Sequence, residues 1–303
     1  MILSRAVLVV AAAHALLTPT TSTVAAQDRE RRAPEAVSLD VMTFNIRTSA
    51  IPDGDDAWAL RKERVAETIA RFDADILGLQ EALAEQIEFL ASELPQYRWV
   101  GVDRGLNGGS GLSEATPIFY RHAEVVPLES GTFWLGDMPN GSYRGRRGGR
   151  GGSRIVTWAR FHHLETGREI WVYNTHLSPR AGRQHIAATD AINARIAALP
   201  PGTPVVVLGD FNATAGASDT WHAATAGGLR DAWDVAAVRE GPAATYNGFR
   251  SPGAEEEGEG RIDWVLVGGP IDVSAAATVV HSRQGRFPSD HFPVLAKLTI
   301  GPS

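Results

Sequence analysis

Polar side chains stand directly after apolar runs at four places along the chain. Phe44-Asn45 follows the first run, Gln80-Glu81 the second, Asn174-Thr175-His176 the third and Asp210-Phe211-Asn212 the fourth. Short apolar runs of this kind are typical of buried strands. In layered folds the strands form a rigid base, the loops at their ends open outward, and binding sites form there. We therefore expect the four groups to meet at one edge of a layered fold.

Apolar patterning divides the chain into expected strands and helices. The expected strands are 37–46, 75–79, 97–102, 117–120, 124–128, 155–161, 170–176, 205–208, 262–267 and 294–300. The expected helices are 57–72, 82–94 and 183–199. Hairpins are the simplest connections among the pieces between residues 97 and 135. Mixed strands with interspersed helices predict an α+β fold, in which two packed sheets are covered by helices.

The first 26 residues differ in composition from the rest. Arg5 is the only charged residue before Asp28, residues 6–17 are almost wholly apolar, and residues 24–26 are small. This pattern predicts a cleaved signal peptide at 1–26, a disordered linker at 27–36 and a single folded domain at 37–301. A membrane anchor is the alternative, but it needs roughly 18 apolar residues in a row, and residues 18–23 interrupt the run. We expect a secreted or periplasmic protein without a membrane anchor.

Charge and cysteine content limit the partners and the means of stabilisation. The chain has no cysteine and 44% hydrophobic residues, so its fold rests on a packed core. Its net charge is −6, which gives no overall attraction to nucleic acid. Two segments have biased composition: 136–153 is rich in Gly and Arg, and 251–260 is rich in Glu. We expect both to be surface loops, either solvated insertions or, for the first, a loop that attracts phosphate.

Each polar group alone is a weak signal, because Asn45 suits a turn and Glu81 suits the start of a helix. Together with two further groups they closely resemble the endonuclease/exonuclease/phosphatase superfamily, and they occur in that family's order. The motifs are Thr43-Phe44-Asn45-Ile46-Arg47, Leu79-Gln80-Glu81, Asn174-Thr175-His176-Leu177, Gly209-Asp210-Phe211-Asn212, Arg261-Ile262-Asp263-Trp264 and Ser289-Asp290-His291-Phe292-Pro293-Val294. The resemblance implies the deoxyribonuclease I-like fold, a four-layer sandwich of two mixed β-sheets flanked by helices.

The resemblance further implies a divalent-metal site. Glu81 matches the family's main carboxylate ligand, and Asn45 and Asp290 match residues in or next to the metal shell. Oxygen ligands of this kind suit a hard ion, so Mg²⁺ is the expected cofactor, with Mn²⁺ as the alternative.

Four residues resemble the family's catalytic groups. Asp210 matches the carboxylate that positions the attacking water, and Asn212 matches the amide that binds phosphate. His291 matches a phosphate-binding histidine, and Asp263 matches the carboxylate that fixes its tautomer and favours the imidazolium. The implied chemistry is in-line attack of a water molecule held by Asp210.

Three further residues are expected around the substrate. His176 resembles a second phosphate-binding histidine, and Glu114 resembles the acid that orients it, although an exposed surface position for Glu114 stays open. Arg154 resembles an arginine that contacts substrate phosphate, with a structural salt bridge as the alternative.

These expectations describe a metal-dependent phosphoesterase, with phosphodiesters as the first expected substrates. The chain resembles the exported bacterial branch of the superfamily most, but it departs from that branch at 136–153 and at Ser178-Pro179, where Asp-His is common. An extracellular nuclease of the deoxyribonuclease I type is the alternative enzyme, and a non-catalytic binding module is the alternative from another class. We expect a monomer whose partner is a phosphate ester, with nucleic acid as one candidate.

Overall fold

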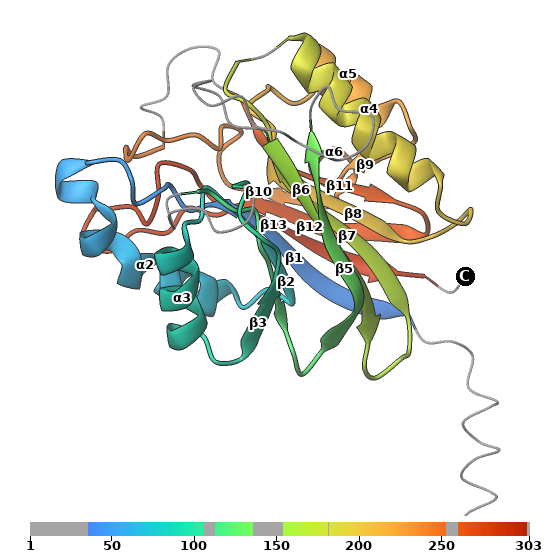
Figure 1. The fold of residues 1–303 in the computed structure, drawn as a ribbon, viewed down its shortest axis with the longest axis horizontal. Helices are drawn as coiled ribbons and strands as arrows, with labels where there is room; N and C mark the ends of the chain where they lie inside the picture. The colour runs from blue at the N-terminus through green and yellow to red at the C-terminus, as the bar shows by residue number, and fades with distance from the viewer. Residues whose placement is uncertain (1–35, 106–112, 136–153, 181, 253–259, 302–303) are drawn as a thin grey trace, which may run out of the picture. The chain divides into compact units, whose positions relative to one another are not determined.

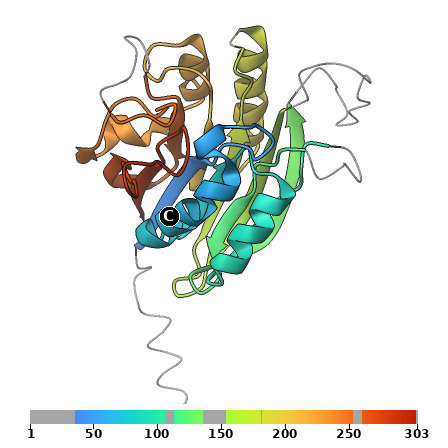
Figure 2. The same cartoon turned by 90° about the vertical axis from the view of Figure 1, so that its left-hand side faces the viewer.

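Two β-sheets lie face to face in the computed structural model, and helices cover their outer surfaces (Figure 1, Figure 2). The structure describes residues 36–105, 113–135, 154–180, 182–252 and 260–301. The predicted signal peptide 1–26, the predicted linker 27–36 except its last residue, the loop 136–153 and most of the loop 251–260 lie outside these ranges. Within the described ranges, no helix is both long and apolar enough to cross a membrane.

The first sheet has seven strands and contains the chain's first strand near its middle. In spatial order they are β10 (Val238–Glu240), β12 (Ile271–Thr278), β13 (Val294–Ile300), β1 (Val37–Asn45), β2 (Ile76–Gln80), β4 (Ile118–Arg121) and β3 (Tyr97–Val100). β1 runs parallel to β2 and antiparallel to β13, so the sheet is mixed.

The second sheet has six strands and carries the other polar strand ends. In spatial order they are β5 (Val125–Leu135), β6 (Arg154–His163), β7 (Glu169–His176), β8 (Val205–Asp210), β11 (Asp263–Gly268) and β9 (Arg230–Asp231). β7 and β8 are parallel, while β8 and β11 are antiparallel.

The helices flank the sheets in two groups, except the short helix 232–235, which contributes Ala232 to the core between the sheets. They are the 3₁₀ helix η1 (Gly54–Asp56), α2 (Trp58–Phe72), α3 (Ala84–Glu93), α4 (Arg183–Ala197), α5 (Asp219–Thr225) and α6 (Ala232–Val235). In α2, Val65 and Ile69 face the protein interior one turn apart, as the apolar spacing predicts. The helix ends where Asp73 adopts a left-handed conformation, with φ 46°.

Three apolar cores separate the four layers. The central core joins residues of both sheets, such as Val41 and Ile76 with Val172 and Leu208. A second core packs α2 and α3 against the seven-stranded sheet, and a third packs α4 and α5 against the six-stranded sheet. The predicted four-layer α+β sandwich is therefore confirmed.

Most expected elements are present within a few residues of their predicted bounds. The differences concern the length of one strand, one connection and several elements that were not expected. β5 extends to Leu135, well beyond the predicted 124–128, because it pairs along its length with β6. β4 and β5 do not form a hairpin, since they belong to different sheets. The elements that were not predicted are η1, α5, α6, β9, β10 and β12. In β12, three consecutive small alanines (275–277) weaken the apolar pattern, although most of its alternate residues are buried.

A buried asparagine joins the two sheets behind the strand ends. The Asn174 side chain donates hydrogen bonds to the carbonyl oxygens of Leu79 (2.8 Å) and Pro117 (2.9 Å), and it accepts one from Gln80 (2.7 Å). Gly78 leaves room for this contact, because a Cβ at that position would lie 2.7 Å from the Asn174 Oδ1. The link fixes the end of β2 relative to the end of β7.

Candidate active site

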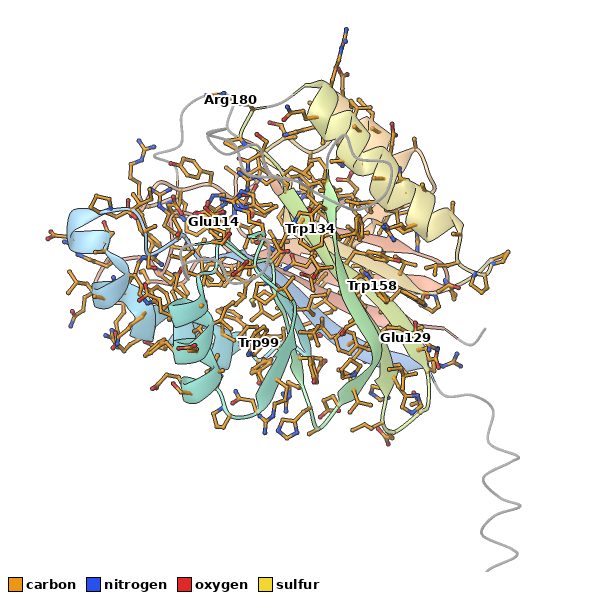
Figure 3. All side chains as sticks on the ribbon, in the orientation of Figure 1. Trp99, Glu114, Glu129, Trp134, Trp158 and Arg180 are labelled. Atoms are coloured by element: carbon orange, nitrogen blue, oxygen red, sulfur yellow. The ribbon has the colours of Figure 1, made fainter. Side chains whose placement is uncertain are left out.

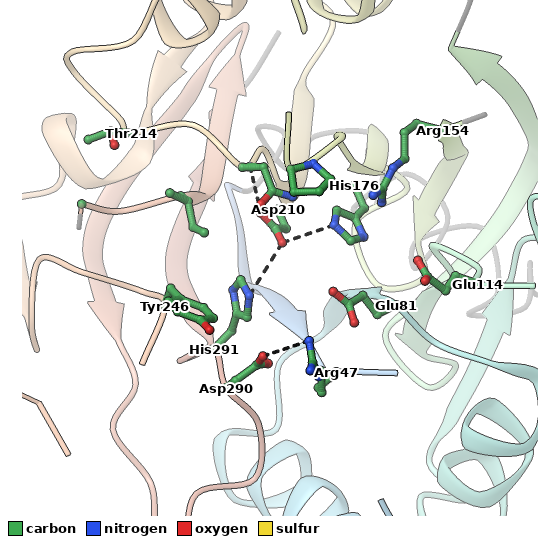
Figure 4. A pocket seen from close by; sticks show the side chains of 14 residues that line it. Arg47, Glu81, Glu114, Arg154, His176, Asp210, Thr214, Tyr246, Asp290 and His291 are labelled. Carbon is green, nitrogen blue, oxygen red and sulfur yellow. Dashed lines mark hydrogen bonds and ion pairs between the residues drawn. The ribbon is translucent and has the colours of Figure 1, made fainter. Parts of the chain in front are cut away.

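A cavity of about 460 Å³ opens where the strand ends of the two sheets meet (Figure 4). Its walls come from segments that are far apart in the sequence. The lining residues are Arg47, Glu81, Glu114, Arg154, His176, Pro179, Asp210, Asn212, Thr214, Tyr246, Gly260, Ile262, Asp290 and His291. All predicted site residues except Asn45 and Asp263 are among them, and these two lie fully buried behind the wall.

Strand register brings three of the predicted residues side by side. His176 ends β7 opposite Asp210 of the parallel strand β8, and Asp210 in turn pairs with Asp263 of β11. Three site residues just beyond strand ends, Arg47, Glu81 and Asn212, adopt left-handed backbone conformations with φ between 48° and 60°. Such conformations are costly for residues with a Cβ and are common at functional sites.

Asp210 occupies the centre of the cluster and is almost completely buried. Its Oδ2 accepts a hydrogen bond from the Asn45 amide (2.9 Å) and lies 3.5 Å from Nε2 of His176, while its Oδ1 accepts the backbone N–H of Asn212 (2.9 Å). Burial, and then the charge of Asp263, raise the pKa of Asp210 to about 7, although these hydrogen bonds and His291 oppose the shift. A carboxylate with such a pKa can hold a water molecule and accept its proton near neutral pH.

His291 is held by Asp263 on the side away from the cavity. Its Nδ1 lies 2.9 Å from Asp263 Oδ2, and its Nε2 faces Asp210 at 3.9 Å. Burial acts to lower the pKa of His291, but the carboxylates of Asp263 and Asp210 outweigh burial, and the pKa is raised well above the usual value. The ring is thus positively charged at neutral pH and can donate a hydrogen bond to a phosphate oxygen.

His176 has the opposite character. Burial, and then the charges of Arg154 and His291, lower its pKa well below the usual value, so the ring is neutral. The two histidines therefore offer one charged and one neutral imidazole on either side of Asp210 (Figure 4).

The predicted metal ligands lie together at the ends of β1 and β2. Asn45 donates a hydrogen bond to Glu81 Oε1 (3.2 Å), and the backbone N–H of Thr48 donates to Glu81 Oε2 (3.0 Å). Asp290 is buried beside them, and the neighbouring Ser289 hydroxyl donates its proton to the carbonyl oxygen of Asn45 (2.7 Å). Each carboxylate oxygen keeps a second lone pair, so this set fits a hard divalent cation.

A second group of side chains also has the spacing of a metal site. Candidate ligand atoms of Asp210, Asp263 and His291 all lie within 4.8 Å of one another, a separation that a metal ion can bridge. In this group, however, Nδ1 of His291 is already engaged by Asp263. The other nitrogen, Nε2, carries a proton on the positively charged ring, so only the two carboxylates are left as ligands for an ion.

Glu114 and Arg154 form the opposite wall. Glu114 makes an ion pair with Arg104 (2.9 Å), and Asp210 rather than Glu114 faces Nε2 of His176, so the orienting role of Glu114 stays a prediction. Burial, and then Arg104, lower the pKa of Arg154. One terminal nitrogen of Arg154 is buried without a hydrogen-bond partner in the described part of the chain, so a buried donor is left for a ligand.

Asn212 lines the cavity but uses its side chain partly for structure. Its amide donates a hydrogen bond to the carbonyl oxygen of Leu177 (3.0 Å), which leaves one N–H of the amide for a ligand. The predicted phosphate contact of Asn212 is therefore compatible with the geometry and stays a prediction.

Sequence reasoning gave no role to six residues of the wall, and two of them have side chains close to the predicted site residues. The six are Arg47, Pro179, Thr214, Tyr246, Gly260 and Ile262. Arg47 ends the first motif, and its charged side chain two residues after Asn45 was a usable signal. Tyr246 packs edge-on against His291, with ring centroids 5.2 Å apart, and its segment pairs with that histidine through an isolated β-bridge. Nothing in the local sequence marks a tyrosine in a loop as part of this site.

Known proteins resemble this chain over most of its length. The model of the endonuclease/exonuclease/phosphatase family matches residues 42–291. A structure of this family from Bacteroides vulgatus shares 32% identity over 88% of this chain and 100% of its own, with a TM-score of 0.78. A second, from Bacteroides thetaiotaomicron, shares 27% over 89% and 100%, also with a TM-score of 0.78. None of the curated proteins compared with the chain matches it.

A third solved structure carries a functional name. A mannosyl-6-phosphatase from Bacteroides thetaiotaomicron shares 27% identity over 86% of this chain and 99% of its own, with a TM-score of 0.75. The family match spans well over half of the sequence, and all six motifs lie in or at the ends of its strands. The chain belongs to the endonuclease/exonuclease/phosphatase family.

Proposed function

We propose that this protein is a divalent-metal-dependent phosphoesterase that hydrolyses its substrate by in-line attack of a water molecule held by Asp210. The observation that carries the proposal is the surrounding of Asp210: a buried carboxylate with a pKa of about 7, between neutral His176 and charged His291. Asp210 then accepts a proton from the attacking water, and His291 stabilises negative charge on the phosphate oxygens.

Glu81, Asn45 and Asp290 are the proposed ligands of the ion, with Mg²⁺ as the first candidate and Mn²⁺ as the second. A divalent ion there would neutralise charge on the phosphate and on the leaving oxygen. We favour these residues over Asp210, Asp263 and His291, because Asp263 already engages Nδ1 of His291 and the second nitrogen of this positively charged ring carries a proton, so the ring has no lone pair for an ion.

We consider three classes of substrate. Phosphodiesters are the first candidate. Phosphate monoesters of sugars are the second, supported by the name of one relative at 27% identity and by a cavity volume in the range of small-molecule sites. A nuclease of the deoxyribonuclease I type is a weaker candidate, because the net charge of −6 provides little attraction to DNA.

We further propose export from the cytoplasm, through the amino-terminal segment 1–26, and a monomeric state. The composition of that segment supports export, as does the resemblance to the exported bacterial branch of the family. Detection of the cleaved protein in the periplasm or medium tests the first proposal, and light scattering tests the second.

Hydrolysis with Mg²⁺ or Mn²⁺ tests the activity. The substrates are bis-nitrophenyl phosphate, nitrophenyl phosphate, mannose 6-phosphate, single- and double-stranded DNA, RNA and sphingomyelin, with Asp210→Ala as the inactive control. Cleavage of one class by the wild type alone supports the proposal and identifies the substrate class. No cleavage of any substrate favours a non-catalytic binding module instead.

Metal binding is tested separately by titration calorimetry. The wild type is expected to bind Mn²⁺, and Glu81→Ala is expected to bind it at least about tenfold more weakly, since the variant loses its main carboxylate ligand. Equal binding by both proteins contradicts the assignment of Glu81 as a ligand.

A further inference from the structure

The backbone of Arg47 is held in a strained conformation by three side chains. Its φ is +55°, a left-handed conformation that is unfavourable for a residue with a Cβ. Its N–H donates to Asn45 Oδ1 (3.0 Å), and its carbonyl oxygen accepts hydrogen bonds from Arg61 (2.6 Å) and Gln86 (3.0 Å). These contacts fix the direction in which the Arg47 side chain points from the backbone.

The guanidinium of Arg47 is fixed by two hydrogen bonds on its outer edge. Nε and Nη2 donate to the two carboxylate oxygens of Asp53 at 3.0 and 2.9 Å, a two-point contact that sets the plane of the group. The hydrogen bond with Asp53 is the main cause of the raised pKa of Arg47, so the side chain is always charged.

The inner edge of the same guanidinium faces the cavity. Its Nη1 lies 3.4 Å from Asp290 Oδ2, which is longer than a strong charge-assisted hydrogen bond. Figure 4 shows the side chain between Asp290 and Glu81, pointing toward the space below Asp210 and His176. The positively charged side chain of Arg47 is therefore held in one orientation beside the proposed metal ligands, and the N–H groups of Nη1 make no short hydrogen bond to Asp290.

We propose that Arg47 binds substrate, its inner N–H groups donating to a non-bridging oxygen of the reacting phosphate next to the Glu81–Asp290 carboxylates. This inference rests on the phosphoesterase function proposed above. Guanidinium N–H groups match phosphate oxygens in geometry and charge, and Asp53 removes the entropy cost of orienting them.

The assignment makes two predictions of opposite sign. A fixed positive charge beside Glu81 and Asp290 repels a divalent cation, and the same charge attracts phosphate. Removal of the charge should therefore strengthen metal binding and weaken phosphate binding. Loss of a merely structural residue would loosen the site and weaken both.

The test compares Arg47→Met with the wild type in the full-length protein. Mn²⁺ binding is measured by calorimetry without substrate, and inorganic phosphate binding by calorimetry with saturating Mn²⁺. We expect Mn²⁺ to bind roughly threefold to tenfold more tightly to the variant. We expect phosphate to bind at least about tenfold more weakly, and KM to rise.

Two further variants keep the test decisive. Arg47→Lys retains the positive charge but lacks the planar guanidinium with its paired N–H donors. Metal affinity should therefore stay near that of the wild type, while phosphate binding still falls. Arg160→Met is the matched control, because it removes one arginine that pairs with Glu129 and Glu169 and does not line the cavity. In Figure 3, Glu129, which pairs with Arg160, lies on the opposite side of the view from Glu114, which lines the cavity. This control should change neither affinity.

The outcomes separate the two proposals. Weaker binding of both ligands by Arg47→Met, or no change in either, overturns the role of Arg47 while the phosphoesterase proposal stands. If the wild type binds neither Mn²⁺ nor phosphate, the proposed function itself is overturned, and with it the role of Arg47.

Discussion

Asp263 Oδ2 lies 2.9 Å from Nδ1 of His291, and both side chains are buried. The contact orients the ring so that Nε2 faces the cavity, and the carboxylate stabilises the ring's positive charge. Asp263 does not line the cavity, so it acts through the histidine and is a positioning residue.

Asp263→Asn tests this relationship. The substitution keeps the shape of the side chain but removes the charge that helps to raise the pKa of His291. We expect turnover to fall by about 10²-fold or more at neutral pH. The alkaline limb of the pH–rate profile should also move to lower pH, because the imidazolium loses its proton earlier. Asp272→Asn, at an exposed position of β12, is the control. An unshifted alkaline limb in Asp263→Asn would contradict the assigned role.

The pKa of Asp210 predicts a pH dependence of stability in the metal-free protein. Its folded pKa of about 7 exceeds the usual value of 3.8, chiefly because of burial. The contribution of Asp210 to the free energy of unfolding is therefore fully present below pH 4. It is lost as the pH rises through about 7, because the ionised carboxylate must then stay buried. Asp210→Asn should match the wild type at pH 4 and be more stable at pH 8. Urea unfolding in the presence of EDTA measures the free energy of unfolding of both proteins. A difference between the two that stays the same from pH 4 to pH 8 would contradict the raised pKa of Asp210.

Asn174 and His176 stand two residues apart on β7 but have different roles. Asn174 links the sheets through buried hydrogen bonds, whereas His176 lines the cavity. We expect Asn174→Ala to lower the free energy of unfolding by about 2–4 kcal/mol, because buried backbone carbonyls lose their donors. His176→Ala should lower activity much more than stability. Chemical denaturation and kinetics of both variants provide the comparison, and equal stability losses would argue against this division.

The sequence predicts the elements of this site well, because strands and polar strand ends are local features. Asn45, Glu81, His176 and Asp210 each follow an apolar run, and register alone brings His176, Asp210 and Asp263 together. The order of strands within each sheet is not local, and neither is the change of sheet between β4 and β5. Those features depend on packing of surfaces that no short segment encodes.

Partners within the site were harder to predict than its members. The sequence alone does not indicate that Glu114 pairs with Arg104, or that Asn45 donates to both Glu81 and Asp210. Each of these contacts joins residues from different elements, and its geometry depends on rotamers set by the surrounding core. Tyr246 lacks a signal for the same reason, since only its contact with His291 places it in the wall.

Arg61 of α2 ties together the two segments that carry Arg47 and Asp290. It is fully buried and donates to the carbonyl oxygens of Asp56 (2.9 Å), Ile46 (2.6 Å), Arg47 (2.6 Å) and Pro288 (2.9 Å). Burial lowers its pKa to about 10, so it stays charged at neutral pH.

Arg61→Lys keeps this charge but cannot reach four carbonyl groups, so it should lower the free energy of unfolding by about 3 kcal/mol or more. Arg64→Lys is the matched control, because Arg64 lies one turn further along α2 and makes a single long bond to Phe287 (3.4 Å). We expect that control to lose no more than about 1 kcal/mol in urea unfolding. Arg61→Lys should also bind Mn²⁺ more weakly, since the Ile46 and Pro288 segments are no longer held together. If the two substitutions had equal effects on urea unfolding and on Mn²⁺ binding, Arg61 would have no special role in holding the Ile46 and Pro288 segments together.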